Sequence, residues 1–383
     1  MGEITGKVIG GGTPKTCVSE YWDGDIPWIQ SSNVQENEMF DFDIPKSITQ
    51  EGLEKSAAKL VPENSIAVVT HVGVGKLVFV PFSYTTSQDF TSLSELKTDA
   101  QFTCYSLYQR IKNDLHIVQG SAIKGITKDD LLSKEIMVPE IQEQRKIGNY
   151  FRKLDNLITL HQRKLDTLKK LKKGFLQKMF PKNGESVPEI RFPGFTDAWE
   201  QRKVSDLLEE RNEQAPESAE YPLMAFIANE GVAPKGERYD RGALVKDAEN
   251  KNYKKTELGD FIYSSNNLET GSIGLNNYGN ASISPVYSIF RPTGIVDSDF
   301  IGRRFVRKDF INSMVKWRQG VVYGQWRIHE SDFLKIEVAV PSLEEQMKIG
   351  SFLDKLDNLI TLHQRKLDTL KKFKQGMLQQ MFI

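Results

Sequence analysis

The stretch KLDNLITLHQRKLDTLKK at residues 153–170 occurs a second time, without a single change, at residues 355–372. A duplication of this length sets the architecture of the whole chain. The likeness also extends toward the N-terminus of each copy, where Pro139 matches Pro341. The chain therefore contains two copies of one long element.

Each copy is predicted to be a single long helix, because its apolar residues recur at spacings of three and four. Residues 143–179 would form a helix about 55 Å long at about 1.5 Å per residue. A helix of that length with one apolar stripe needs a partner, and we expect the two copies to pair as an antiparallel coiled coil. The residues expected at the interface are Leu154, Ile158, His161, Leu165, Leu168, Leu356, Ile360, His363, Leu367 and Leu370.

Two histidines, His161 and His363, fall on this apolar stripe at equivalent positions. They could form a metal or pH-sensitive site, or they could be polar residues that fix the register of the coiled coil. We favour the register, because no carboxylate or cysteine accompanies either histidine at the spacing of metal ligands. Cys17 and Cys104 belong to no Cys/His cluster and are expected to be buried thiols, so no metal site is predicted.

The repeat divides the chain into five parts. The helices are assigned to residues 139–180 and 341–383, and a linker rich in proline and glycine to residues 181–198. Residues 1–138 and 199–340 are globular segments with short apolar runs bounded by turn residues, which indicates mixed α/β domains dominated by strands. The predicted fold class is α+β, with two such domains joined by the two helices.

Composition narrows the class of protein. With 383 residues, of which 39% are hydrophobic and 27% charged, the chain suits two folded domains. No apolar run approaches the roughly 20 residues that span a bilayer, so no membrane protein is expected. The opening MGEITGKVIGGGTPKT does not have the pattern of a secretory signal, which predicts a cytoplasmic location. The net charge of zero offers no general argument for nucleic-acid binding, although basic residues are in excess in the two repeated segments.

Several side chains in turn-rich places could contact DNA, since arginine, glutamine and asparagine pair with base edges. Residues 299–327 are also rich in basic side chains. The candidates are Asn266, Asn267, Arg303, Arg304, Arg318, Tyr323, Gln325 and Arg327 in the second domain, and Lys15, Asn33, His71 and Lys76 in the first. The alternative is that these residues build an ordinary surface and core, and the acidic excess of the first domain argues against nonspecific phosphate binding.

Catalytic signatures are missing from the sequence. The Gly75-Lys76 pair has Thr70 where a phosphate-binding loop needs glycine, and Val78 stands where a dinucleotide fingerprint needs its third glycine. No two prolines are adjacent, so the Pro-Pro-aromatic motif expected of an amino-methylating enzyme is absent. HExxH, GxSxG and kinase motifs are absent as well. The chain is therefore expected not to be an enzyme.

Three features together resemble the specificity subunits of type I restriction-modification systems: GGTPKT near the start, RFPGFTDAWEQRK at 191–203, and a Pro-x3-Glu-Gln segment ahead of each repeated helix. The resemblance spans nearly the full chain. It implies two target recognition domains that each read one half of a split sequence in double-stranded DNA, held apart by the paired helices.

The resemblance also implies partners. The helices would dock two modification subunits, which bring S-adenosylmethionine and methylate adenine, and motor-nuclease restriction subunits would add ATP and Mg for translocation and cleavage. No cofactor is expected in this chain itself. The main alternative is a coiled-coil scaffold with two protein-binding or glycan-binding domains, which would suit the neutral charge, and a standalone nuclease is a third class.

One departure from the family pattern concerns the first domain. RFPGFTDAWEQRKVSDLL precedes the second domain, whereas the given sequence opens at the counterpart of about Ser205. The first domain therefore has no matching lead-in segment in this sequence.

Overall fold

The computed structural model describes residues 1–36, 38–117, 125–182, 184–234, 251–320 and 326–382. The chain divides into two compact units: unit 1 comprises Met1–Lys164 with His363–Ile383, and unit 2 comprises Leu165–Leu362. Each unit contains one globular domain and a part of both long helices, α4 (Ile141–Lys178) and α9 (Leu343–Met381).

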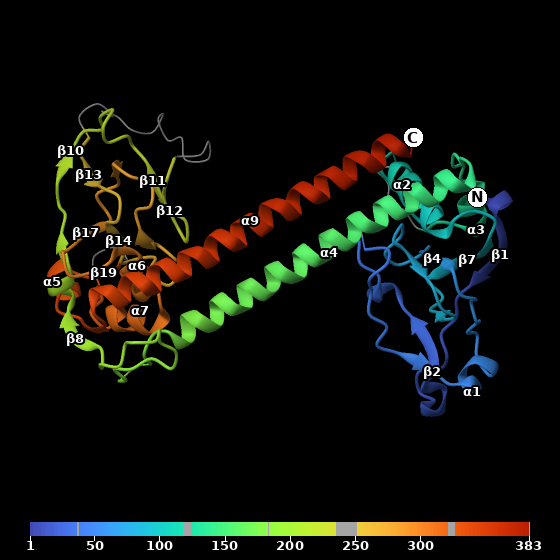
Figure 1. The fold of residues 1–383 in the computed structure, drawn as a ribbon, viewed down its shortest axis with the longest axis horizontal. Coiled ribbons are helices and arrows are strands. Elements are labelled where there is room, and N and C mark those ends of the chain that lie inside the picture. The colour runs from blue at the N-terminus through green and yellow to red at the C-terminus, as the bar shows by residue number, and fades with distance from the viewer. Residues whose placement is uncertain (37, 118–124, 183, 235–250, 321–325, 383) are drawn as a thin grey trace. The chain divides into compact units, whose positions relative to one another are not determined.

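Unit 1 is built on a four-stranded antiparallel sheet with the strand order β1-β7-β4-β5 (Figure 1). These strands are β1 (Thr5–Gly10), β7 (Phe90–Leu96), β4 (Ser65–Val69) and β5 (Leu77–Val80). A smaller sheet has the order β3-β2-β6, with β2 (Trp22–Ile29), β3 (Ser47–Ile48) and β6 (Thr85–Thr86). The helices are α1 (Gln50–Glu54), α2 (Ala100–Ile117) and α3 (Lys128–Ser133), and the short 3-10 turns are Gly2–Ile4, Ser19–Tyr21 and Ser31–Asn33.

The core of unit 1 follows from the uninterrupted apolar run of β4. All five of its residues are buried, as expected of a strand covered on both faces. Ile66 and Val68 pack against α2 and the long helices, whereas Ala67 and Val69 face a second cluster around Tyr84. The sequence prediction that both cysteines are buried is half wrong, because Cys17 lies exposed in the loop after β1 while Cys104 is buried in α2.

Unit 2 repeats the same sheet. Its strand order is β15-β14-β17-β9, which matches β5-β4-β7-β1 of unit 1 strand for strand. These strands are β9 (Leu208–Glu210), β14 (Phe261–Tyr263), β15 (Ile273–Leu275) and β17 (Ser288–Pro292). The duplication therefore includes the globular domains as well as the helices.

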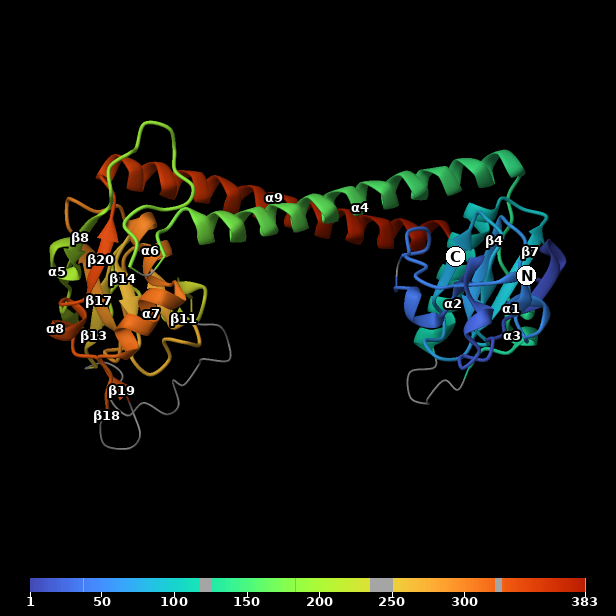
Figure 2. The same ribbon diagram turned by 90° about the horizontal axis from the view of Figure 1, so that it is seen from below.

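The rest of unit 2 consists of short elements around this sheet (Figure 2). The further strands are β8 (Glu200–Lys203), β10 (Gln214–Ala215), β11 (Ala225–Ile227), β12 (Gly231–Ala233), β13 (Tyr253–Thr256), β16 (Ala281–Ile283), β18 (Gln319–Gly320), β19 (Trp326–Arg327) and β20 (Glu337–Val340). The helices are α5 (Val204–Leu207), α6 (Ser298–Phe305), α7 (Lys308–Val315) and α8 (Glu330–Phe333).

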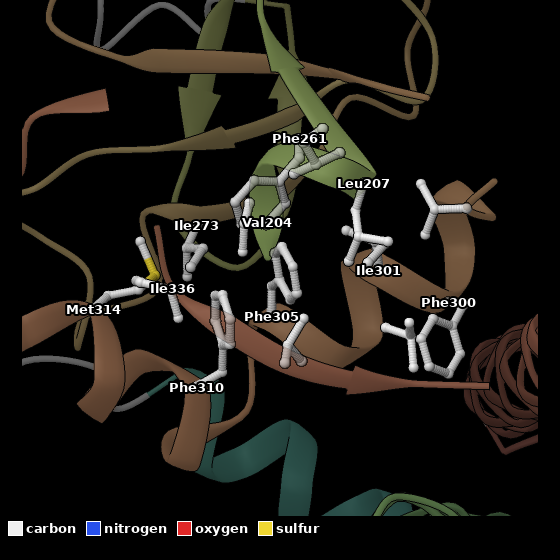
Figure 3. Close-up of a cluster of buried hydrophobic side chains, with 14 of the residues drawn as sticks. Val204, Leu207, Phe261, Ile273, Phe300, Ile301, Phe305, Phe310, Met314 and Ile336 are labelled. Carbon is white, nitrogen blue, oxygen red and sulfur yellow. The ribbon is translucent and has the colours of Figure 1, made fainter. Parts of the chain in front are cut away.

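Aromatic side chains fill the core of unit 2. Figure 3 shows Phe305 of α6 and Phe310 of α7 side by side, and their ring centroids are 3.9 Å apart. Phe261 of β14 meets Phe305 edge to face at 5.2 Å. Truncation of such a phenylalanine to alanine typically costs about 3–5 kcal/mol of stability, so these rings hold α6 and α7 against the sheet.

The two long helices run antiparallel in each unit, as the sequence predicted. In unit 1, Phe151 contacts Phe382 at 5.7 Å and His161 Nδ1 lies 3.0 Å from His363 Nδ1, so residue numbers rise along α4 as they fall along α9. In unit 2, Phe175 contacts Phe352 at 4.9 Å. The α+β fold with an antiparallel coiled coil is thereby confirmed. None of the helices in the described parts of the chain combines the length and apolar character that a membrane crossing requires.

Candidate nucleic-acid interface

The four candidates of unit 1 lie in loops. Lys15 and His71 are exposed, in the loop after β1 and directly after β4. Asn33 is half-buried in a 3-10 turn, where its Oδ1 accepts a hydrogen bond from the backbone of Gln30 at 2.9 Å. Lys76, just ahead of β5, donates to the carbonyl of Val34 at 3.1 Å.

Hydrogen bonds draw these loops to the same end of the unit. The hydroxyl of Thr13 donates to Gln88. The hydroxyl of Ser31 donates to Asp89 at 3.4 Å, and the backbone N–H of Thr70 donates to the carbonyl of Asp89 at 2.7 Å. Three loops that are distant in sequence thus meet at residues 87–89, which gathers the four candidates at one end of the first domain.

In unit 2, β14 and β15 form the hairpin that corresponds to β4 and β5 of unit 1. Four other candidates lie in this hairpin or beside it. Asn266 Oδ1 accepts from the backbone N–H of Trp326 at 2.6 Å, and this bond fixes the hairpin against β19, which contains the exposed Arg327. Arg318 donates to both carboxylate oxygens of Glu269 at 2.9 and 2.7 Å. Asn267 is exposed in the same hairpin. The candidates Tyr323 and Gln325 lie outside the described residues.

Arg303 and Arg304 are placed elsewhere. Arg303 of α6 forms ion pairs with Asp357, at 2.9 Å, and with Asp354, both on α9. Arg304 is 9% exposed and pairs with Asp309 at 2.7 Å. Because these guanidinium groups are engaged inside unit 2, we assign Arg303 and Arg304 a structural role. The same holds for Arg318, whose side chain is 11% exposed and paired with Glu269. The remaining candidates stay predicted DNA contacts.

One glutamine near the start of each long helix connects that helix to the globular domain of its unit. Neither glutamine was a candidate from the sequence. Gln144 Oε1 accepts from the backbone N–H of Asp99 at 2.9 Å, and its Nε2 donates to the carbonyl of Pro139 at 2.7 Å. Gln346 repeats both bonds, with Asp297 at 3.0 Å and Pro341 at 2.9 Å. In the sequence, these two glutamines could have been identified as the last residue of the repeated Pro-x3-Glu-Gln segment.

Equivalent aspartates on the two helices provide a second connection. Asp155 accepts from the hydroxyl of Tyr105 at 2.6 Å and pairs with Lys374 at 2.5 Å. Its counterpart Asp357 pairs with Lys172 and with the arginine of α6 described above. In each unit one carboxylate therefore joins α4, α9 and the first helix after the sheet.

Gly148 of α4 lies close to α2, and Gly350 of α9 lies close to α6, because neither glycine has a side chain. A Cβ added at Gly148 would lie 3.2 Å from Cβ of Gln101, and one added at Gly350 would lie 3.2 Å from Cβ of Asp299. Asp299 is the acidic counterpart of Gln101. Burial raises the pKa of Asp299 to about 6, and the nearby carboxylate of Asp354 adds to the rise.

The predicted coiled-coil residues are all buried or half-buried, among them Leu165 and Leu367 at 1% exposure. On the same helices, other leucines at exact repeat positions face outward. Leu157 and Leu160 are 47% and 61% exposed in unit 1, and Leu359 and Leu362 are 42% and 49% exposed in unit 2. Each unit therefore presents the same apolar pair on its helices.

Among the described residues no cluster of histidine, cysteine and carboxylate side chains could hold a metal ion. At the contact between the two helices, burial lowers the pKa of His363, and the nearby positive charges of Lys164 and His161 lower it further. A hydrogen bond between the two Nδ1 atoms requires that one imidazole be neutral.

Comparison with known proteins gives concordant matches. The family model of the type I restriction modification DNA specificity domain matches residues 1–170 and again 196–372. The MjaIX specificity subunit of a type I restriction enzyme from Methanocaldococcus jannaschii is 22% identical over 408 residues, which cover 97% of this chain and 89% of that protein. Among curated relatives the likeness thus extends over nearly the whole chain.

Solved structures agree in fold. The S subunit of a type I restriction-modification system from M. genitalium matches with a TM-score of 0.59 and 14% identity, over 100% of this chain and 94% of that one. A chain from a study of complex assembly and conformational transition of the type I R-M system matches with a TM-score of 0.51 and 16% identity, over 100% and 96%.

Proposed function

This chain belongs to the type I restriction-modification DNA specificity family, and on that premise we propose that it reads a split DNA sequence and directs partner subunits to it. Unit 1 would read one half of the target and unit 2 the other. The chain itself would perform no catalysis. Its role would place it in the cytoplasm with chromosomal DNA.

The observation that carries this proposal is the contrast between constant and variable parts of the duplication. The two sheets share one strand order, and the helices share an identical stretch. The hairpins that hold the candidates differ, with THVGVGK at 70–76 in unit 1 and SSNNLETGS at 264–272 in unit 2. Two copies of one support with different loops are suited to reading two different sequences, because base contacts depend on the loop side chains.

The helices support a second part of the proposal, namely that two modification subunits bind. The exposed pair of Leu157 and Leu160 recurs as Leu359 and Leu362, and repeated apolar patches on a soluble surface suit two copies of one protein partner. We propose that these partners bring S-adenosylmethionine for adenine methylation. Restriction subunits that use ATP and Mg would complete the complex.

The proposal is tested by exchanging one domain. In the complex with the modification partner, residues 199–340 are replaced by the counterpart from another subunit of the family, and the methylated sequence is mapped across a genome. We expect one half of the target to change and the other half to remain. If both halves change together, or neither does, the assignment of one reader to each unit is wrong.

A pair of point variants tests the loops. Arg327→Ala and Arg202→Ala each remove an arginine that forms an ion pair with a nearby glutamate, at β19 and β8 respectively. If the side chain contacts a base, we expect Arg327→Ala to weaken specific DNA binding by about 1–3 kcal/mol. If it contacts a phosphate, the slope of the logarithm of the binding constant against the logarithm of the salt concentration should fall in magnitude by about one. Arg202→Ala, on the strand that pairs with β20, should change neither. Equal effects of the two variants would contradict the proposed surface.

A further inference from the structure

An exposed apolar side chain, that of Val72, lies in the hairpin between β4 and β5 of unit 1. It is 72% exposed, whereas Val69 and Val78, in the strands on either side, are fully buried. Val72 lies between His71 and Lys76, two of the predicted DNA contacts, but it was not itself a candidate from the sequence. Single exposed apolar residues are common on protein surfaces. Whether Val72 has a role therefore depends on where the hairpin holds it.

The hairpin is anchored by its own backbone and by α2. The backbone N–H of Val69 donates to the carbonyl of Lys76 at 2.8 Å, and that of Gly75 donates to the carbonyl of Val69 at 3.1 Å. Gly75 has a φ of +92°, and a Cβ added to it would lie 2.6 Å from Cδ1 of Leu115. The turn thus rests directly on α2, and Val72 extends from an anchored backbone.

Two neighbouring segments hold Thr70, at the start of the turn. Its backbone N–H donates to the carbonyl of Asp89 at 2.7 Å, and its carbonyl accepts from the backbone N–H of Ile126 at 2.9 Å. Asp89 belongs to the place where the loops with the four candidates of unit 1 meet. The turn that contains Val72 is therefore part of the end of unit 1 that we propose reads DNA.

The chemistry of a valine side chain limits what it can contact on a base pair. Its isopropyl group neither donates nor accepts a hydrogen bond, and a polar base edge placed against it would lose hydrogen bonds to water without replacement. In the major groove, the apolar group that base pairs present is the C5 methyl of thymine. A valine at a base edge therefore favours thymine over the other bases.

The corresponding hairpin of unit 2 presents different chemistry. Asn267 is exposed there, and Leu268, the apolar residue of SSNNLETGS at 264–272, is fully buried. An exposed apolar tip is thus a feature of the first hairpin and not of the second. If the two hairpins read bases, a methyl contact from a hairpin tip is expected in one half of the target only.

We propose that Val72 selects a thymine in the half of the target that unit 1 reads, through contact between its side chain and the C5 methyl group of that base. This inference rests on the proposed DNA-reading function and assigns one base type within it. Loss of one buried methyl group is expected to weaken binding about fourfold.

The test uses the complex of the full chain with its modification partner and a duplex that contains the mapped target. The domain exchange described above identifies the half that belongs to unit 1. Each thymine in that half is replaced in turn by deoxyuridine, which lacks the methyl group and keeps the base pair. We expect one replacement to weaken binding about fourfold. The Val72→Ala complex should bind the thymine duplex about as weakly as the original complex binds this uracil duplex, and the replacement should have no further effect on it.

Phe82→Ala is the matched control. Phe82 is also an exposed apolar residue, but it follows β5 and so lies at the other end of the β4–β5 pair. This variant should keep both the affinity and the response to deoxyuridine of the original chain. Because Val72 is exposed, its truncation removes few contacts within the protein and should not unfold it.

The results separate the role of Val72 from the function on which it rests. Three results overturn the role of Val72 alone: specific binding to a target with no thymine in that half, specific binding that no replacement weakens, or a weakening that persists in Val72→Ala. Binding that does not distinguish the target from an unrelated duplex overturns the proposed function, and this inference with it.

Discussion

Asp299 occupies a position at which the two copies of the duplicated unit differ. Its side chain lies between α6 and α9, close to Asp354, whereas the first copy has the neutral Gln101 at this place. Burial of this carboxyl group disfavours its ionised form, and the approach of a second carboxylate disfavours it further. The second copy therefore has an electrostatic penalty at neutral pH that the first copy lacks.

The first prediction is that Asp299→Gln stabilises unit 2 at high pH. A carboxyl whose folded pKa is about 6, above its ordinary value of 3.8, stabilises the fold below about pH 3.8 and loses that contribution as the pH rises through about 6. Since the side chain is only half-buried and solvent screens it, we expect a gain of about 1 kcal/mol at pH 8. Thermal melts at pH 4 and pH 8 measure it, and a gain of equal size at both values would contradict this account.

The second prediction concerns the contact between His161 and His363. Because the folded pKa of His363 is lowered below 6.5, the unfolded chain binds more protons there, and stability falls as the pH drops below about 6.5. His161→Asn combined with His363→Asn keeps polar side chains at this seam and removes the titration.

We expect the melting temperature of the original chain to drop more between pH 7.5 and 5.5 than that of the double variant. The other histidines are present in both chains, so the difference isolates this pair. Identical pH dependence in the two chains would exclude the histidine contact as its cause.

At the scale of elements, the helices combine two functions in one sequence. One face is buried in the coiled coil, the outward face contains the repeated leucine pairs, and Gln144 with Gln346 fixes each helix to its domain. The buried face and the outward leucines use different positions of the identical stretch, so most substitutions within it would disturb one of the two. This gives a physical reason for two identical copies.

The third prediction rests on the proposal of a split target, with the implication of the family resemblance that the paired helices hold the two target recognition domains apart. One heptad added to both copies at the same place preserves the apolar seam and lengthens each helix by about 10.5 Å at about 1.5 Å per residue. This is close to three base pairs at about 3.4 Å each, so we expect the unread gap between half-sites to change by about two to four base pairs.

Mapping of the methylated sequence measures the gap, and each half-site should stay the same. A heptad added to only one helix is the control, because it breaks the register and should abolish activity. An unchanged gap with full activity in the matched variant would disprove the spacing role.

At the scale of the whole molecule, the fourth prediction is that the purified chain neither methylates nor cuts DNA. The motifs for these reactions are absent from the sequence, and we propose that the partners provide them. Incubation with labelled S-adenosylmethionine and a DNA substrate should give no transfer above background, and addition of the modification partner should restore it. Methyl transfer by the chain alone would show that a catalytic site was overlooked.

The sequence by itself determined the repetitive and locally encoded parts of this protein. The exact repeat and its apolar spacing predicted both long helices and their antiparallel pairing, since helical periodicity is a property of neighbouring residues. The buried run of β4 was likewise visible as an uninterrupted apolar segment. The order of the strands in each sheet could not be predicted from the sequence, because strand pairing joins residues far apart in the chain.

Only the tertiary structure decided what individual polar side chains do. Arg303 has the composition of a DNA contact in sequence, yet it pairs with Asp357, which is 54 residues away. Cys17 is exposed, and Glu143 is exposed while its counterpart Glu345 is buried and paired with Arg191. The physical reason is that burial and ion pairing depend on which distant segment lies opposite a residue, and two similar local sequences do not specify that segment.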